Sequence, residues 1–194
     1  MAERFESSDI EMSVISLSGR PGLLGTVIRK RLSQYHVVKP VPGWSMLWPA
    51  SVIRCLRQPN AEVVHIHSAW LKAALAAHLA SIRRVIYTEH GREHRDPPMA
   101  QRLDRLAARW TDIVVPVSER LLSYLHLQLG IPVARMRTIE NGVDTQRFAP
   151  GPASQAMSAR LNLPDGALVV GSVGRVEVVK AYDRLLEAFA MIRA

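Results

Sequence analysis

The sequence predicts an α/β fold, a doubly wound parallel sheet with helices packed on it. Short β-rich runs alternate along the chain with helical patterns of about 10–15 residues, which is the order of strand–helix–strand units. Several of these runs (VISL, EVVHI, DIVVPV and LVVGSV) are apolar on both faces. Such runs are typical of parallel strands that helices cover on both sides.

The predicted strands are rich in Val and Ile, and they cover residues 12–17, 35–39, 62–67, 84–88, 112–117, 136–139 and 168–173. The predicted helices show apolar positions at helical spacing, and they cover residues 23–32, 47–58, 71–81, 99–110, 119–129 and 181–193. Ser118 is expected to cap the helix at 119–129. Asn141-Gly142 predicts a tight turn after a strand, since both residues tolerate positive φ.

A linker is predicted at 148–164, where Pro, Gly, Ser and Ala dominate. It divides the chain into residues 1–150, a domain with six strands, and residues 151–194, the linker and the start of a second domain. One strand and one helix are too few to bury a core of their own. The second domain is therefore expected to be incomplete.

The composition is that of a globular protein, with 48% hydrophobic and 22% charged residues in 194. The single Cys55 excludes an intramolecular disulfide framework, and its apolar helical setting favours a core residue over a nucleophile. No secretory signal or membrane-spanning run is visible, and the sequence predicts a cytoplasmic protein.

The formal net charge of +8 predicts an anionic partner, namely a nucleotide, an acidic membrane surface or nucleic acid. Each basic cluster taken alone, such as Arg92 with Arg95, is interpreted as a solvated surface. Only 6% of the residues are aromatic, and no nucleic-acid-binding module is present. Nucleic acid is therefore not expected, and contact with the anionic inner face of the cytoplasmic membrane is the alternative use of these cations.

A phosphate site is predicted where the last β-rich run ends. The run LVVGSV leads into Gly174-Arg175, and a helix is predicted to begin at Lys180. A helix N-terminus contributes unpaired N–H groups and about half a positive charge, and two cations beside it suit a diphosphate. The crevice beyond the carboxyl ends of parallel strands is where doubly wound folds bind nucleotides.

The ordered set EVVHIHSAW, VIYTEHGR, WTDIVVPVSERLLSYL, IENGVDTQRFAPG and VGRVEVVKAYDRLLEAFA resembles the retaining glycosyltransferases of family 4. The likeness runs from about Glu11 to the end, and is nearest to sugar transferases of bacterial surface-polysaccharide clusters. It implies a GT-B fold, in which two Rossmann-like domains face a cleft. It also implies that this chain lacks the first strand and most of the second domain.

The resemblance assigns roles to particular residues. Arg175 and Lys180 would grip the donor diphosphate without a bound metal, and His90 would lie near the reacting sugar. Gly142 and Gly174 would lie close to the donor. The family usually has Gly where this chain has Ala181, which crowds the backbone approach to phosphate.

Two histidine patterns are left open by the residues themselves. His65 and His67 alternate on a predicted strand, and strand-end packing and a place in the cleft both fit them. The run from His90 to His94 spells H-x-x-E-H, a zinc-protease pattern. A β-run before it and Pro97 after it do not fit the helix that this pattern needs, and a zinc site is not expected.

The resemblance thus implies transfer of a sugar from a nucleotide-sugar to a lipid-linked or saccharide acceptor, with retention, in cell-surface polysaccharide biosynthesis. The chain as given is expected to be an inactive fragment. The alternative is a non-catalytic basic domain that binds an anionic membrane surface or nucleic acid.

Overall fold

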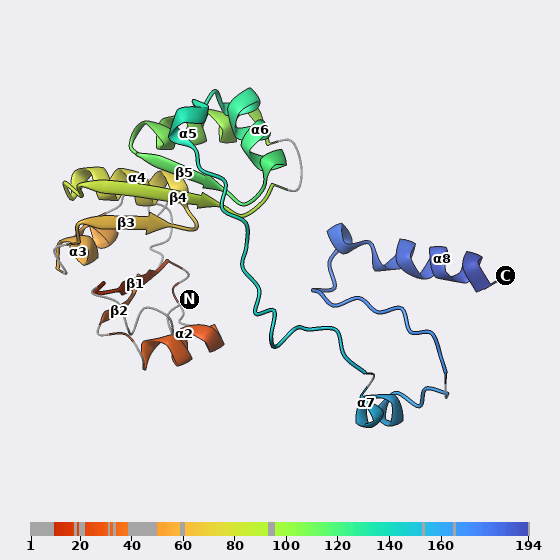
Figure 1. The fold of residues 1–194 in the computed structure, drawn as a ribbon. Coiled ribbons are helices and arrows are strands. Elements are labelled where there is room, and N and C mark those ends of the chain that lie inside the picture. The colour runs from red at the N-terminus through yellow and green to blue at the C-terminus, as the bar shows by residue number, and fades with distance from the viewer. Residues whose placement is uncertain are drawn as a thin grey trace. The chain divides into compact units, whose positions relative to one another are not determined.

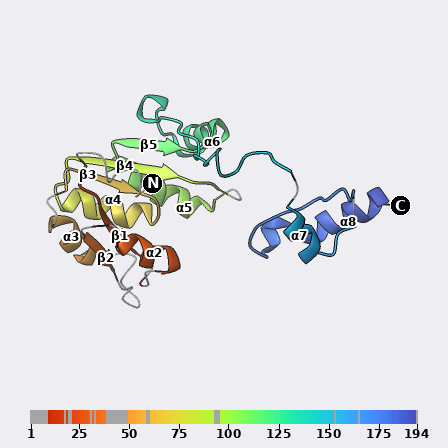
Figure 2. The same ribbon diagram turned by 60° about the horizontal axis from the view of Figure 1, so that its bottom comes forward.

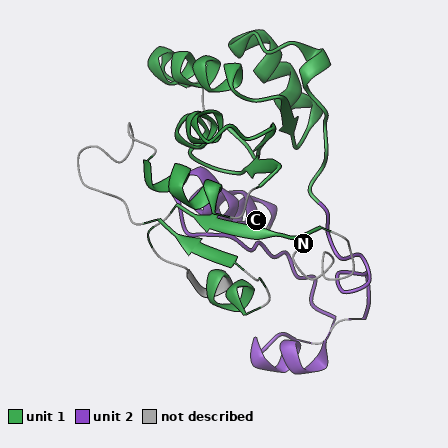
Figure 3. Ribbon diagram, turned by 90° about the vertical axis from the view of Figure 1, so that its left-hand side faces the viewer, with its two compact units in different colours: residues 1–141 green, residues 142–194 purple. Residues whose placement is uncertain are grey.

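The computed structural model describes residues 10–17, 19, 22–30, 32, 34–38, 50–58, 61–92, 96–152, 154–164 and 166–193. The chain forms two compact units, Met1–Asn141 and Gly142–Ala194 (Figure 3). We describe each unit by itself. The predicted domain boundary at residue 150 stays a prediction.

Strands and helices alternate through the first unit, as the sequence predicts (Figure 1). The strands are β1 (Ser13–Ser16), β2 (Gln34–Val37), β3 (Val63–Ile66), β4 (Arg84–Glu89) and β5 (Ile113–Pro116). The helices are α2 (Gly22–Arg29), α3 (Ala50–Arg57), α4 (Trp70–Leu79), α5 (Pro98–Arg109) and α6 (Glu119–Leu129), followed by a 3₁₀ turn at Val133–Arg135.

Among the residues that the structure describes, all strand pairing is parallel and falls into two sheets, β1-β2 and β3-β4-β5. In a doubly wound sheet of order 3-2-1-4-5-6 the first strand lies at the centre. The break between β1 and β3 falls at the place where the resemblance implies a missing strand. That missing strand stays a prediction.

The predicted strand at 136–139 forms only a single parallel bridge, between Met136 and Val114. The amide of Arg137 donates to the carbonyl of Val114 (3.1 Å), and the amide of Ile139 donates to Pro116 (3.1 Å). The segment therefore follows the free edge of β5 without becoming a regular strand.

The core of this unit lies between β3, β4 and β5 and the helices α4, α5 and α6. Helices α4 and α5 lie along the same side of the three-stranded sheet (Figure 2). Four small side chains of α4 are buried, Ala73, Ala74, Ala76 and Ala77, which allows α3 and α5 to pack closely against it. Cys55 is half-buried against this core as predicted, and burial raises the pKa of its thiol.

The aromatic centre of the core is a stacked pair, Trp70 and Tyr87, with ring centroids 4.1 Å apart. The indole Nε1 of Trp70 donates to Oγ1 of buried Thr111 (2.8 Å), and Thr111 donates in turn to the carbonyl of Ala107 (3.0 Å). Burying an indole requires a partner for its N–H group. This chain of bonds ties the start of α4 to the end of α5.

One helix start has the cap that the sequence predicts, and another has no side-chain cap. Ser118 caps α6 as predicted, since its Oγ accepts from the amide of Leu121 (3.3 Å). Helix α4 instead follows Ala69, which has left-handed backbone (φ 50°) and makes no side-chain cap. An alanine in this conformation costs about 1–2 kcal/mol relative to a right-handed one.

The second unit contains α7 (Gln155–Arg160), a 3₁₀ turn at Val178–Lys180 and α8 (Tyr182–Arg193). Helix α7 lies inside the predicted linker, where Ser154 supplies a cap to the amide of Met157 (3.3 Å). The predicted strand at 168–173 is wrong for this structure, because the described residues of this unit contain no strand. A strand needs a neighbour for its N–H and C=O groups.

None of the helices in the described part of the chain is long and apolar enough to cross a bilayer.

Candidate functional site

Three histidine rings meet where β3 and β4 end. His65 lies on β3, His67 follows that strand directly, and His90 follows β4. Nε2 of His65 lies 2.7 Å from Oγ1 of Thr88, and Nδ1 of His67 lies 2.9 Å from Nε2 of His90. The sequence left two roles open for His65 and His67, strand-end packing and a place in the cleft, although the carboxyl ends of neighbouring parallel strands converge. This property of parallel sheets could have predicted that His65 and His67 lie close to His90.

Partial burial acts on the protonation of these rings. It lowers the pKa of His65 and of His67, since a charged imidazolium loses hydration there. The neighbouring histidines lower both further by like-charge repulsion. A neutral imidazole offers one N–H donor and one acceptor nitrogen, which suits a sugar hydroxyl.

The chain just after His90 is held by a partly buried ionic cluster around Arg92. Its guanidinium lies 2.7 Å from Glu89, 2.5 Å from Asp96 and 2.7 Å from Asp104. The Arg92 side chain is only 11% exposed, so its interpretation as a solvated surface cation is wrong. Charge-assisted bonds to three carboxylates hold the end of β4 against α5.

Hydroxyl groups complete this cluster. The Tyr87 hydroxyl donates to Glu89 (3.0 Å), and the Tyr124 hydroxyl donates to Asp96 (2.8 Å). The amide of Gly91 also donates to Glu89 (3.3 Å). Burial raises the pKa of Tyr87, and the adjacent Glu89 carboxylate raises it further. His90 therefore stands between two anchored residues, Glu89 and Gly91.

The balance between burial, which raises a carboxyl pKa, and bonds from Arg92, which lower it, differs between two of the carboxyls that face Arg92. It raises the pKa of Asp104, which lies on α5. In Asp96, bonds from Arg92 and Tyr124 outweigh burial and hold the pKa below its usual range. The segment that would complete the zinc-protease pattern, Glu93 to His94, lies outside the described residues.

The predicted donor residues lie in the second unit. A Cβ atom added at Gly174 would lie 2.7 Å from the Tyr182 hydroxyl and 4.0 Å from Cγ of Lys180, so these residues adjoin. Arg175 pairs with Glu177 (2.8 Å), and its side chain is 77% exposed. Both cations are thus on a surface and not in an apolar interior; their contact with a donor stays a prediction.

Ala181 departs from the family pattern at a place where the backbone matters. Its φ is 47° and its ψ is 47°, a left-handed conformation that glycine adopts without steric cost. The predicted helix start at Lys180 is accordingly corrected, since a 3₁₀ turn ends at Lys180 and α8 begins at Tyr182.

The predicted turn at Asn141-Gly142 is displaced. Neither residue has positive φ, and the turn lies at 145–148. Asp144 organises it, because its Oδ1 accepts from the amides of Gln146 (3.1 Å) and Arg147 (2.9 Å). A Cβ atom at Gly142 would meet nothing within 4 Å, and the donor role of Gly142 stays a prediction.

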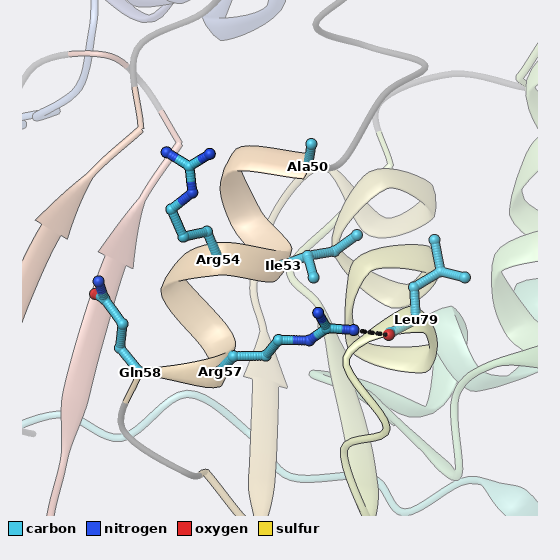
Figure 4. A pocket seen from close by; sticks show the side chains of 6 residues that line it. All are labelled: Ala50, Ile53, Arg54, Arg57, Gln58 and Leu79. Carbon is cyan, nitrogen blue, oxygen red and sulfur yellow. Dashed lines mark hydrogen bonds between the residues drawn. The ribbon is translucent and has the colours of Figure 1, made fainter.

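A pocket of about 640 Å³ lies elsewhere, between α3 and the end of α4 (Figure 4). Its lining includes Ile53, Arg54 and Leu79, and Arg57 donates from Nη2 to the carbonyl of Leu79 (3.1 Å). Helix α4 leads away from the carboxyl end of β3, so its last residue lies at the opposite edge of the sheet. The pocket is therefore separate from the histidine cluster.

Sequence comparison relates the chain to sugar transferases. A GDP-mannose-dependent alpha-(1-6)-phosphatidylinositol monomannoside mannosyltransferase of Mycobacterium tuberculosis (strain ATCC 25618 / H37Rv) is 33% identical over 171 residues, covering 84% of this chain and 44% of that protein. A D-inositol 3-phosphate glycosyltransferase 1 of Catenulispora acidiphila is 30% identical over 151 residues, covering 71% of this chain and 36% of that protein. The chain spans less than half the length of either relative.

Solved structures share the fold. Anabaena Alr3699/HepE in complex with UDP and glucose matches with a TM-score of 0.74 and 18% identity, over 91% of this chain and 56% of that one. A glycosyltransferase from Rickettsia africae matches with a TM-score of 0.61 and 18% identity, over 79% of this chain and 42% of that one. The predicted α/β, Rossmann-like GT-B fold is confirmed for the part of it that the chain covers.

Residues 1–147, three quarters of the chain, match the sequence family described as Glycosyltransferase Family 4. The resemblance in the motifs is thereby confirmed. The chain belongs to glycosyltransferase family 4.

Proposed function

We propose that the complete gene product containing these residues transfers a sugar from a nucleotide-sugar donor to a lipid-linked or saccharide acceptor, with retention of anomeric configuration. The match of residues 1–147 to glycosyltransferase family 4 carries this proposal. The convergence of three histidines at the carboxyl ends of β3 and β4 supports it, since ligands of open α/β sheets bind there.

The donor would be held from the second unit. Arg175 and Lys180 carry positive charge on either side of the turn after Gly174, where the Tyr182 hydroxyl packs close to the glycine backbone. Charge builds on the departing nucleoside diphosphate in the transition state, so these cations would act most strongly there. In this proposal they replace a divalent ion, and no metal or other cofactor takes part.

His90 would stand on the acceptor side of the reaction. Its ring nitrogen can hydrogen-bond a sugar hydroxyl, either to orient the acceptor or to contact the reacting sugar. The partly buried ionic cluster around Arg92 would keep this ring in place from one turnover to the next. Gly142 would lie near the donor and contribute only backbone.

The relatives' names point to acceptors that carry phosphate. Both contain inositol in phosphorylated form, and one of them is a lipid. We therefore place the protein at the inner face of the cytoplasmic membrane, in biosynthesis of surface polysaccharide or glycolipid, with the +8 charge favouring anionic lipid. Nucleic acid has no part in this function.

The 194-residue chain alone would not catalyse the sugar transfer. It spans less than half of either relative, and no described residue of its second unit is buried. A site with only part of its donor domain cannot stabilise the transition state fully. Robust turnover by the purified 194-residue chain would contradict this part of the proposal.

The test is a donor and acceptor screen with the complete gene product. UDP- and GDP-sugars are paired with inositol phosphate, phosphatidylinositol and oligosaccharide acceptors, and release of nucleoside diphosphate is measured. Product stereochemistry by NMR reports retention. Failure to release diphosphate with any pair, under conditions where the protein is folded, would overturn the proposal.

Variants then test the donor site. Arg175→Ala and Lys180→Ala are each expected to lower turnover by about 10²- to 10³-fold, as for loss of one preorganised charge-stabilising group. Arg184→Ala, an exposed cation on α8, is the matched control and should retain turnover. Wild-type turnover in Arg175→Ala and Lys180→Ala, as in the control, would refute the donor assignment while leaving the family assignment intact.

A further inference from the structure

His67 makes a direct hydrogen bond to the ring of His90. The distance between Nδ1 of His67 and Nε2 of His90 is 2.9 Å, and the two ring planes lie 27° apart with centroids separated by 5.2 Å. Both rings reach solvent, and no described residue hydrogen-bonds Nδ1 of His90. Within the described part of the chain, Nε2 of His90 is thus occupied and its Nδ1 has no partner.

The neighbouring His65 has a different partner. Its Nε2 bonds Oγ1 of the buried Thr88 (2.7 Å), and its ring lies against His67 with centroids 4.2 Å apart. His65 therefore packs beside the pair without bonding to His90. Substitution of His65 is therefore a matched control for the loss of an imidazole near His90.

We propose that His67 is a positioning residue, which fixes the ring orientation of His90 and couples its tautomer to that of His67. A neutral imidazole carries one N–H, so a bond between two neutral rings requires one ring to donate and the other to accept. If His67 donates, His90 carries its proton on Nδ1 and offers a donor there. If His90 donates from Nε2, its Nδ1 is an acceptor.

Either way, Nδ1 is the nitrogen of His90 that faces a ligand. An imidazole whose far nitrogen is bonded is held in one ring orientation, as second partners do for histidines that bind metals. Because the partner here is another imidazole, the tautomers of the two rings change together. The inference that the two rings are bonded depends only on their geometry. The inference that Nδ1 binds a sugar hydroxyl depends on the function proposed above.

The bond is tested on the 194-residue chain by the ¹⁵N shifts of the His90 ring at about pH 8, where histidines are neutral. In His67→Ala, the His90 shifts should move to those of a free imidazole that exchanges between tautomers. His67→Asn, whose amide can lie near the former Nδ1, should restore the wild-type shifts in part. Core methyl shifts report whether each variant is folded.

His65→Ala is the control and should leave the His90 shifts unchanged. His90 shifts that do not differ between wild type and folded His67→Ala would overturn the proposal. An equal change in His65→Ala would do so as well, because it would show a general disturbance of the strand ends.

Turnover of the complete gene product separates this inference from the proposed function. His67→Ala should lower kcat by about 10- to 100-fold, by analogy with the outer partners of metal-binding histidines, and His67→Asn should recover part of it. If His90→Ala leaves turnover intact while the ring shifts respond to His67→Ala, the role of His90 fails and the positioning stands. If His90→Ala abolishes turnover but the shifts ignore His67, the positioning fails alone.

Discussion

Each of the two units contains an apolar, β-rich sequence, but only the one in the first unit forms a strand. DIVVPV in the first unit becomes β5, whose Val114 is fully buried (0% exposed), because β4 pairs with it and α6 packs on it. LVVGSV in the second unit remains irregular, and its Leu168 is 92% exposed. A β-rich pattern expresses a preference for a pleated surface with neighbours, and it forms a strand only where those neighbours exist.

The charged residues show the same contrast. Arg92 is enclosed by three carboxylates and two tyrosine hydroxyls bonded to them, whereas Arg175 has a single exposed partner, Glu177. An ion pair is strong where burial removes water and further bonds complete the geometry, and weak where solvent competes. Arg92 thus stabilises the first unit, whereas the exposed Arg175 in the second unit is accessible to a ligand.

The largest expected effect comes from truncating the aromatic centre of the first unit. Trp70→Ala should lower the free energy of unfolding by about 3–5 kcal/mol, since Trp70 is 4% exposed and loses both its stacking on Tyr87 and its bond to Thr111. Leu186→Ala on α8, 70% exposed, should change it by less than about 0.5 kcal/mol. Urea unfolding followed by far-UV circular dichroism measures both, and equal shifts of the midpoint would remove the contrast between the units.

Removing the guanidinium at the centre of the ionic cluster should come next. Arg92→Met leaves Glu89, Asp96 and Asp104 without their common partner, and we expect a loss of about 3 kcal/mol. Arg175→Met should be nearly neutral, because its ion pair is exposed.

Acidification sharpens the Arg92→Met result. The deficit relative to wild type, measured at the same pH, should shrink as the carboxylates of the variant become protonated. A deficit that does not depend on pH would mean that Arg92 stabilises by packing its stem, and not by its charge.

The sequence predicted most helices and strands of the first unit but few of its polar contacts. Alternation of apolar runs identifies β3, β4 and β5 because local periodicity carries that information. The partners of Arg92 lie 3, 4 and 12 residues away, and the contact to Asp104 depends on how α5 returns across the sheet. The bond between His67 and His90 spans 23 residues. It required the register of β3 on β4, which sequence alone does not define.

A third prediction uses the uneven distribution of histidine. All seven histidines lie before residue 142. Two of them, His65 and His67, have a lowered pKa, so their proton uptake should destabilise the first unit. Burial and the neighbouring histidine rings lower the folded pKa of His65 and of His67 below its ordinary value. Their contribution to stability is therefore fully present above the unfolded pKa and is lost as pH falls through the folded pKa.

Urea midpoints measured at about pH 7.5 and about pH 5 should differ in the wild type and differ less in the double variant His65→Asn/His67→Asn. The double variant serves as the control for carboxyl groups, among them Asp104, whose raised pKa acts in the opposite direction on acidification. An unchanged difference between the two midpoints would show that other groups titrate with folding.

The smallest expected effect compares two alanines in the same strained conformation. Ala69 precedes α4 with φ 50° and ψ 47°, and Ala181 precedes α8 with φ 47° and ψ 47°. Glycine relieves the steric cost at either place but raises the entropy of the unfolded chain, so the net gain should be about 0.5–1 kcal/mol. Because α4 belongs to the packed core, Ala69→Gly should raise the urea midpoint of the first unit. Ala181→Gly should leave that midpoint unchanged and alter only local amide exchange at the start of α8. A shift of the midpoint by Ala181→Gly would show that the second unit unfolds together with the first.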